Sequence, residues 1–145
     1  MAKLKFDIVT AEKVVYTDDV DVVVVPGMEG QLSILPDHAP LLTMLQPGEL
    51  TVRKSGDETV MFVNGGFLEV MRNHVTVLAD VCERADDIDI ARAEAAKRRA
   101  EEQLQDRAAI TDLATAEAAL RRALLRIKIA ERRKQRHGPP RVQPR

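Results

Sequence analysis

The spacing of apolar residues changes once along this chain of 145 residues, close to residue 86. Before that point, apolar side chains alternate with polar ones in short runs, as in Leu4, Phe6 and Ile8, which is the two-residue period of a β-strand. After it, alanines dominate long stretches without glycine or proline, which is typical of helices. The sequence therefore predicts a β-rich domain over residues 1–85 and a helical region over residues 86–136.

Seven segments of the first part have the composition of short strands. Turn-forming sequences such as Ser55-Gly56 and Gly65-Gly66 separate them. Strands this short and frequent favour an antiparallel sandwich or barrel. The unbroken run of valines over residues 22–25 favours a strand covered on both faces, at the centre of a sheet. The predicted strands span residues 3–9, 14–17, 20–25, 50–54, 59–63, 67–71 and 75–79.

Residues 26–48 form the most distinctive segment of the chain, with four prolines among many apolar residues. Taken alone, they indicate a rigid loop that exposes apolar side chains. A structural crossover between sheets is the favoured interpretation from the residues, and a contact surface is the alternative.

Two helices are predicted in the second part. Three aspartates within residues 86–89 suit a helix N-terminus, whose free N–H groups and positive dipole end favour carboxylates. The first helix is expected over residues 88–107, and the second runs from an N-cap at Thr111 to residue 135, where a Gly-Pro-Pro sequence follows. Residues 137–145 are expected to form a disordered tail.

The surface shared by these helices would consist of small side chains. Alanines permit close approach but bury little, so the hairpin would gain only a few kcal/mol, at about 0.8 kcal/mol per buried methylene. A ligand or a partner could displace a hairpin packed this weakly. The alanines expected in the shared surface are Ala91, Ala95, Ala96, Ala100, Ala116, Ala119 and Ala123.

Charge is distributed unevenly along the chain. Residues 1–85 carry a net charge of −6, residues 86–119 carry −4, and residues 120–145 carry +9. A nucleic-acid-binding module is one class of protein that uses a cationic arm of this kind. The acidic N-terminal part and the scarcity of aromatic residues for base stacking argue against it. We therefore expect no nucleic-acid partner.

No enzymatic or metal site is indicated. The sequence has no P-loop, CxxC or HExxH spacing, its three histidines are scattered, and its single cysteine, Cys82, is expected to be a buried strand residue. The N-terminus lacks the apolar stretch of a secretory signal, and no run of about 18 apolar residues occurs, so we expect a cytosolic location and no insertion into the bilayer.

Several motifs in a fixed order resemble the epsilon subunit family of the bacterial F-type ATP synthase. They are residues 26–48, Asn64-Gly65-Gly66-Phe67-Leu68-Glu69-Val70 and Val75-Thr76-Val77-Leu78-Ala79-Asp80, and the resemblance covers residues 3–135. It implies a β-sandwich of about ten antiparallel strands with a C-terminal helical hairpin. It also implies a non-catalytic rotor subunit that joins the gamma subunit to the c-ring in the central stalk. Such a subunit lies peripherally, at the cytoplasmic face of the bacterial cell membrane.

The resemblance also implies which residues contact the rotor, and it favours the contact-surface interpretation of residues 26–48. By position, Glu29, Gly30 and Gln31 would face the c-ring. Family members often carry an acid where this chain has Gln31, so a charged contact there is in doubt. The remaining stalk contacts would be His38, Ala39, Leu41 and Leu42.

The sequence Ile88-Asp89-Ile90-Ala91-Arg92-Ala93 is similar to a motif that binds ATP in some bacterial members of the family. Arg92 and Arg99 are two helical turns apart, and Arg122 and Arg126 are one turn apart, so an antiparallel hairpin would bring four guanidinium groups together for a triphosphate. The resemblance places Glu83 and Asp89 near the nucleoside. ATP would be a regulatory ligand, and no cofactor is required.

Two plainer interpretations of these residues remain open. Asp89 and Arg92 have the spacing of a local ion pair combined with helix capping. The arginines of the hairpin would form a stripe that faces solvent or a partner. The residues assigned to ATP binding are Glu83, Ile88, Asp89, Arg92, Ala93, Arg99, Arg122 and Arg126.

The basic second helix implies an inhibitory contact in this family. The opened hairpin would extend along gamma among the alpha and beta subunits, where its cations would meet acidic segments of beta and oppose ATP hydrolysis. ATP bound to the folded hairpin would favour the non-inhibitory state by a population shift. The arginines assigned to this contact are Arg122, Arg126, Arg132 and Arg133.

Overall fold

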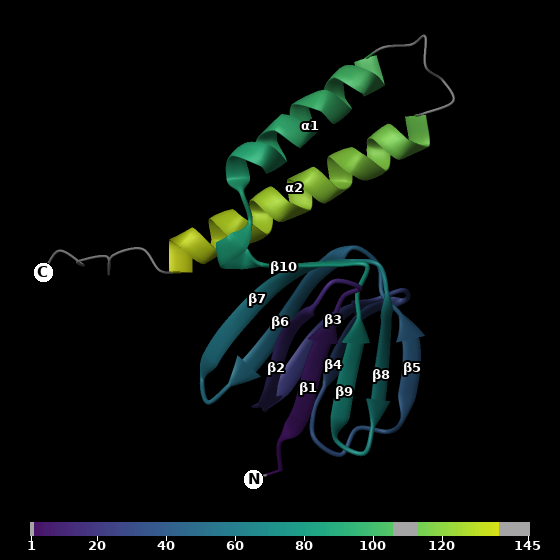
Figure 1. Cartoon of the computed structure of the whole chain (residues 1–145), viewed down its shortest axis with the longest axis vertical. Helices are drawn as coiled ribbons and strands as arrows, with labels where there is room; N and C mark the ends of the chain where they lie inside the picture. The colour runs from purple at the N-terminus through teal and green to yellow at the C-terminus, as the bar shows by residue number, and fades with distance from the viewer. Residues whose placement is uncertain (1, 106–112, 137–145) are drawn as a thin grey trace, which may run out of the picture.

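The computed structural model describes residues 2–105 and 113–136 (Figure 1). Ten strands are followed by a short 3-10 helix and two α-helices. The strands are β1 (Leu4–Val9), β2 (Val14–Val20), β3 (Val22–Gly27), β4 (Gly30–Ile34), β5 (Leu41–Met44), β6 (Gly48–Lys54), β7 (Asp57–Asn64), β8 (Phe67–Met71), β9 (His74–Leu78) and β10 (Val81–Arg84). The helices are η1 (Ala85–Asp87), α1 (Ile90–Gln105) and α2 (Leu113–Arg136). Among the described residues, no helix is long and apolar enough to cross a membrane.

The strands form two five-stranded sheets. The first sheet has the order β2-β1-β9-β8-β5, and the second has the order β10-β7-β6-β3-β4. Neighbouring strands are antiparallel except β1 and β9, which run parallel with Phe6 opposite Val75. The predicted sandwich of about ten strands, followed by two C-terminal helices, is confirmed.

The core lies between the two sheets. Every second side chain along a strand faces inward, and these side chains meet there. Phe6 and Ile8 of β1 are fully buried, and they share one apolar cluster with Val25 of β3 and Met61 of β7. Burying a side chain of this size stabilises the fold by about 1.5–3 kcal/mol. The alternation seen at the start of the sequence therefore marks the face of β1 that packs inward.

Two strands lie in the segment that was interpreted as a loop. Residues 26–48 contain β4 and β5, so the loop interpretation is wrong over Gly30–Ile34 and Leu41–Met44. Both are short strands at the edge of a sheet, and the prolines of the segment fall in the connections or at the end of a neighbouring strand. The short strand β10 was also not predicted.

The valine-rich strand is covered on both faces but is not central. Val23 and Val25 face the core, while Val24, on the opposite face, is only 7% exposed. The strand lies between β6 and β4, one position from the sheet edge, so its predicted place at the centre is wrong. A valine run indicates that both faces of a strand are covered, but it does not specify the position of the strand among its neighbours.

Gly66 lets the chain pass from one sheet to the other between β7 and β8. Its φ of +110° lies in a region that residues with a Cβ rarely adopt. A Cβ at this position would come within 2.0 Å of the Leu78 carbonyl oxygen. Glycine is therefore required here both by the backbone conformation and by the neighbouring strand.

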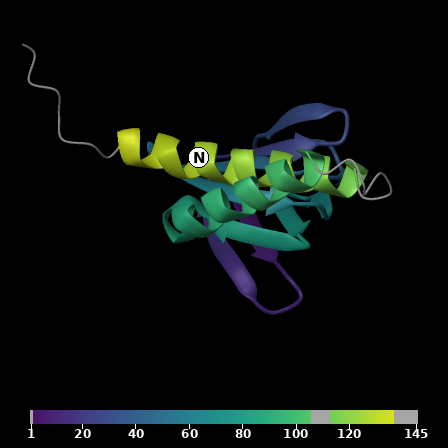
Figure 2. The ribbon, with the colours of Figure 1, turned by 90° about the horizontal axis from the view of Figure 1, so that it is seen from above.

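The two α-helices pack side by side as a hairpin above the sandwich (Figures 1 and 2). The predicted ends at Arg107 and Thr111 lie outside the described residues. Small side chains form the shared surface, as predicted, although Ala91 is exposed and does not belong to it. The alanines that are buried on the two helices are Ala93, Ala100, Ala116, Ala123 and Ala130.

A second apolar cluster attaches the hairpin to the sandwich. Ile129 and Ala130 of α2 are buried against Val60 and Phe62 of β7, on the sheet face opposite the core, together with Ile88. This cluster is separate from the main core, so α2 takes no part in the packing between the sheets.

Candidate functional site

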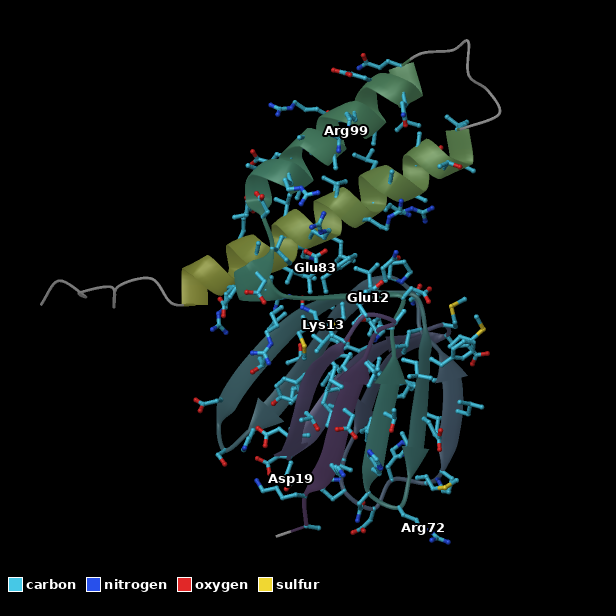
Figure 3. The ribbon with its side chains drawn as sticks, viewed as in Figure 1. Glu12, Lys13, Asp19, Arg72, Glu83 and Arg99 are labelled. Atoms are coloured by element: carbon cyan, nitrogen blue, oxygen red, sulfur yellow. The ribbon has the colours of Figure 1, made fainter. Side chains whose placement is uncertain are left out.

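Three of the residues assigned to ATP binding surround one cavity between the hairpin and the sandwich. Glu83 of β10 lies below α2, which contributes Arg122 and Arg126 (Figure 3). The cavity has a volume of about 220 Å³. Its lining comprises Phe62, Asn64, Val81, Glu83, Ala96, Ala119, Arg122, Ala123 and Arg126.

An ion pair crosses this cavity. A terminal nitrogen of Arg126 donates to Oε2 of Glu83 at 2.8 Å, and the two side chains are about one quarter exposed. Nε of Arg126 is buried and has no hydrogen-bond partner among the described residues. A buried donor without a partner costs about 1–3 kcal/mol. Arg126 therefore places a cationic side chain in the cavity wall, paired with Glu83.

The arginines of α1 flank the cavity but do not line it. Ala96 is a lining residue, and Arg92 and Arg99 lie four residues before it and three residues after it, on one stripe of the helix. Both arginines are exposed, and Figure 3 shows Arg99 on α1. The cavity brings Arg122 and Arg126 together and does not include the two arginines of α1.

The remaining motif residues have structural roles in this conformation. The backbone N–H of Arg92 donates to Oδ1 of Asp89 at 3.1 Å, so Asp89 caps the start of α1. Ile88 belongs to the apolar cluster under α2, and Ala93 is fully buried. The capping interpretation of the motif therefore holds for Asp89, alongside any role in ligand binding.

Three arginines of α2 are paired with the sandwich or with η1. Arg132 donates to Glu49 of β6 at 2.6 Å, and Arg133 pairs with Asp86 of η1 at 2.9 Å, in addition to the pair between Arg126 and Glu83. Sequence reasoning identified the arginines but missed Glu49 and Asp86 as their partners. Ordinary acidic residues at separations of up to 83 positions give no local signal of this pairing.

The predicted rotor-contact residues gather mainly at one apolar groove. Five of the seven line it, namely Glu29, Gly30, Gln31, Leu41 and Leu42, in a groove of about 790 Å³. The other lining residues are Gly27, Met28, Leu32, Thr43, Met44 and Phe67, which sequence reasoning had not assigned to this contact.

Several apolar side chains of the groove are exposed. Leu42 is 72% exposed, and Met28, Met44 and Phe67 are each about half exposed. His38 and Ala39 do not line this groove and occupy the connection between β4 and β5, where Nδ1 of His38 contacts the carbonyl oxygen of Ala39 at 2.7 Å. Exposed apolar side chains grouped in this way are a feature of surfaces that bind other proteins or membranes.

Cys82 lies on β10, half-buried, and packs against the core. Burial raises the pKa of its thiol to about 11. The thiol is therefore protonated at neutral pH and does not act as a nucleophile.

Comparison with known families matches nearly the whole described chain. The model of the ATP synthase delta/epsilon chain β-sandwich domain matches residues 3–85, and that of the delta/epsilon long α-helix domain matches residues 86–131. Two solved assemblies contain chains of similar fold. One is the mitochondrial ATP synthase of Euglena gracilis, with a TM-score of 0.67, 19% identity, and coverage of 94% of this chain and 82% of that one. The other is the central stalk and c-ring of the Tetrahymena thermophila enzyme, with a TM-score of 0.56, 16% identity, and coverage of 89% and 97%.

Curated bacterial relatives agree with the family models. An ATP synthase epsilon chain of Dehalococcoides mccartyi is 55% identical over 141 residues, which cover 93% of this chain and 97% of the relative. One from Desulforamulus reducens is 51% identical over 132 residues, which cover 90% and 100%. The chain therefore belongs to the ATP synthase delta/epsilon family, as a non-catalytic component of that enzyme.

Proposed function

We propose that the chain is a central-stalk subunit that joins the gamma subunit to the c-ring, and that the groove between β3, β4 and β5 is part of this contact. The observation that carries the proposal is the exposure of Leu42, Met28, Met44 and Phe67 on one face of the sandwich. Burying this surface in a permanent assembly removes apolar area from water at about 25 cal/mol per Å².

The turn between β3 and β4 suits a contact with a ring of subunits. Glu29, Gly30 and Gln31 lie at or beside this turn, and they line the groove from one side, while Leu41 and Leu42 line it from β5. In this proposal the turn faces the c-ring, and the β5 side with His38 and Ala39 faces gamma. The subunit then lies peripherally at the cytoplasmic face of the bacterial cell membrane, held there by the c-ring.

A pair of substitutions tests the groove. Leu42→Asp places a charge on a surface that the proposal buries, so recovery of gamma with the tagged subunit should fall about tenfold or more. Val14→Asp is the matched control, since Val14 is 61% exposed on β2, at the other edge of the same sheet. Equal recovery of gamma by both variants and the unmodified chain would exclude the groove as the docking surface.

We infer further that ATP binds as a regulatory ligand between the hairpin and the sandwich. The two arginines of α2 that line the cavity beside Glu83 support a polyanionic ligand there. A cavity of about 220 Å³ is small for a nucleotide, which requires the Arg126–Glu83 pair to rearrange. Arg92 and Arg99 would then turn toward the phosphates from their stripe on α1.

Regulation in this proposal depends on an equilibrium between a folded and an opened hairpin. The folded hairpin is the state that would bind ATP, and the opened hairpin is the state that would present Arg122, Arg126, Arg132 and Arg133 to acidic segments of the beta subunits. A ligand shifts such an equilibrium by its preference for one state. Low ATP would therefore favour the inhibitory form.

Calorimetric titration of the full-length subunit with ATP tests the ligand. Binding should be measurable for the unmodified chain and at least tenfold weaker for Arg126→Ala, because the cavity loses its central cation. Arg98→Ala, an exposed arginine on α1, is the matched control and should bind as the unmodified chain does. An absence of binding heat at millimolar ATP would refute nucleotide sensing while leaving the stalk assignment intact.

A further inference from the structure

The last described turns of α2 carry an electrostatic contact that is separate from the nucleotide cavity. Arg132 pairs with Glu49 at 2.6 Å, and Arg133 pairs with Asp86 at 2.9 Å. None of these four residues lines the cavity around Glu83. The contact therefore concerns the attachment of the hairpin and not the ligand.

These two pairs flank the apolar attachment of α2. Arg132 and Arg133 follow Ile129 by three and four residues, which places all three on the helix face that meets the sandwich. Ile129 is 1% exposed and packs on Val60 and Phe62 of β7. Charged and apolar contacts consequently break together when the hairpin lifts from the sheet.

Of the two carboxylates that pair with α2 here, Glu49 is more buried than Asp86, so its ion pair is the stronger one. Its side chain is 23% exposed, whereas that of Asp86 is 62% exposed. Glu49 also accepts a hydrogen bond from the hydroxyl of Thr51 at 3.4 Å. A charge-assisted pair gains strength as water is excluded from it.

The neighbouring charges make departure of Arg132 unfavourable. Two cavities of about 440 and 350 Å³ meet at Arg132, and both are lined by Glu49 and Glu58. Asp57, Arg53 and Arg133 complete the charged lining, and Arg53 pairs with Glu58 at 3.4 Å. Without Arg132, Glu49 would face these carboxylates with one cation fewer.

We propose that the Arg132–Glu49 and Arg133–Asp86 pairs form a latch that holds the hairpin on the sandwich without nucleotide. The partner that opens it is an acidic protein surface, whose carboxylates replace those that the two arginines give up. This inference rests on the proposed function, in which the extended hairpin presents these arginines to acidic segments. The latch and the inhibitory contact are mutually exclusive because they use the same guanidinium groups.

A thiol placed under α2 measures release of the latch. Val60 is 9% exposed in the cluster beneath the helix, so the thiol introduced by Val60→Cys, in a Cys82→Ser background, reacts only when the hairpin lifts or the chain unfolds. The thiol introduced by Val63→Cys, in the fully buried main core, reports unfolding alone. Labelling rates for the full-length subunit without nucleotide give the open population.

Glu49→Gln should raise the labelling rate at position 60 about fivefold and leave the rate at position 63 unchanged, as expected for loss of a partly buried ion pair. Asp18→Asn is the matched control, since Asp18 pairs with Lys54 within the sandwich at 2.7 Å. Raising salt from about 0.1 M to 1 M shortens the screening length from about 10 to 3 Å and should speed labelling of the unmodified latch more than that of Glu49→Gln.

If Glu49→Gln also raises the labelling rate at position 63, a charge exchange separates loss of the ion pair from loosening of the sandwich. Combining Glu49→Arg with Arg132→Glu should restore slow labelling relative to either single change, because the pair is rebuilt with opposite polarity. Labelling at position 60 that is the same in Glu49→Gln, Asp18→Asn and the unmodified chain would overturn the latch. Because no step uses ATP, failure of nucleotide binding in calorimetry would not be mistaken for failure of the latch.

Discussion

Ile129→Ala should release the hairpin while leaving the sandwich intact. Ile129 is 1% exposed and lies in the apolar cluster that joins α2 to β7, apart from the main core. The change removes three carbon atoms, worth about 2.4 kcal/mol at 0.8 kcal/mol per methylene. A residual cavity would raise the cost toward the upper part of the observed range of about 2–5 kcal/mol. The open population should therefore increase about 50-fold or more.

Hydrogen exchange measured by mass spectrometry follows this release. Most helical stability in proteins comes from tertiary packing, which α2 loses on release, so peptides from α2 should exchange faster in Ile129→Ala, whereas peptides from β1 should keep their protection. Leu124→Ala is the control on the same helix, because Leu124 is 44% exposed and its truncation should change stability by no more than about 0.5 kcal/mol. Equal acceleration in α2 and β1 would refute the separation of the two apolar clusters.

Three further predictions concern the sandwich. Gly66→Ala should lower the stability of the sandwich by more than about 1 kcal/mol in urea denaturation, because its Cβ would collide with the Leu78 carbonyl; an unchanged midpoint would contradict this. Hydrogen bonds from Thr17 and His74 lower the pKa of Asp7 below its usual value, so Asp7 stabilises the fold above about pH 4 and this contribution is lost as pH falls through the lowered pKa. The stability advantage of the unmodified chain over Asp7→Asn should therefore narrow on acidification in pH-dependent denaturation, and a constant gap would count against it. Burial raises the pKa of the Cys82 thiol to about 11, so its alkylation at neutral pH should be much slower than that of a free thiol of pKa about 8.5, and a rate equal to that of glutathione would disprove its burial.

Much of the fold could be predicted from local patterns. Alternation in residues 3–9 predicted a half-buried strand, and the aspartates before α1 predicted its start, where Asp89 caps the helix. The strands within residues 26–48 were not predicted because they are short edge strands beside prolines. They contain too few residues to show the alternation of apolar and polar side chains.

The candidate sites were predicted less completely. The resemblance indicated Glu83, and helical spacing indicated Arg122 and Arg126, and the fold brings all three around one cavity. Neither of them indicated Glu49, because the pairing with Arg132 depends on where α2 lies on the outer face of β6 and β7. The groove residues Met28 and Phe67 were missed because an exposed apolar residue has the same sequence signature as a buried one.

The sequence by itself determined the division into a β-sandwich and a helical hairpin, since periods of two and 3.6 residues are properties of each segment alone. It also determined the small-residue surface between the helices and the basic character of α2. Only the tertiary structure decided which carboxylates form ion pairs with those basic residues. Arg126 pairs with Glu83 and Arg132 pairs with Glu49, at separations of 43 and 83 positions. The physical reason is that an ion pair requires two groups within a few ångströms, and sequence patterns carry no information on distances between remote segments.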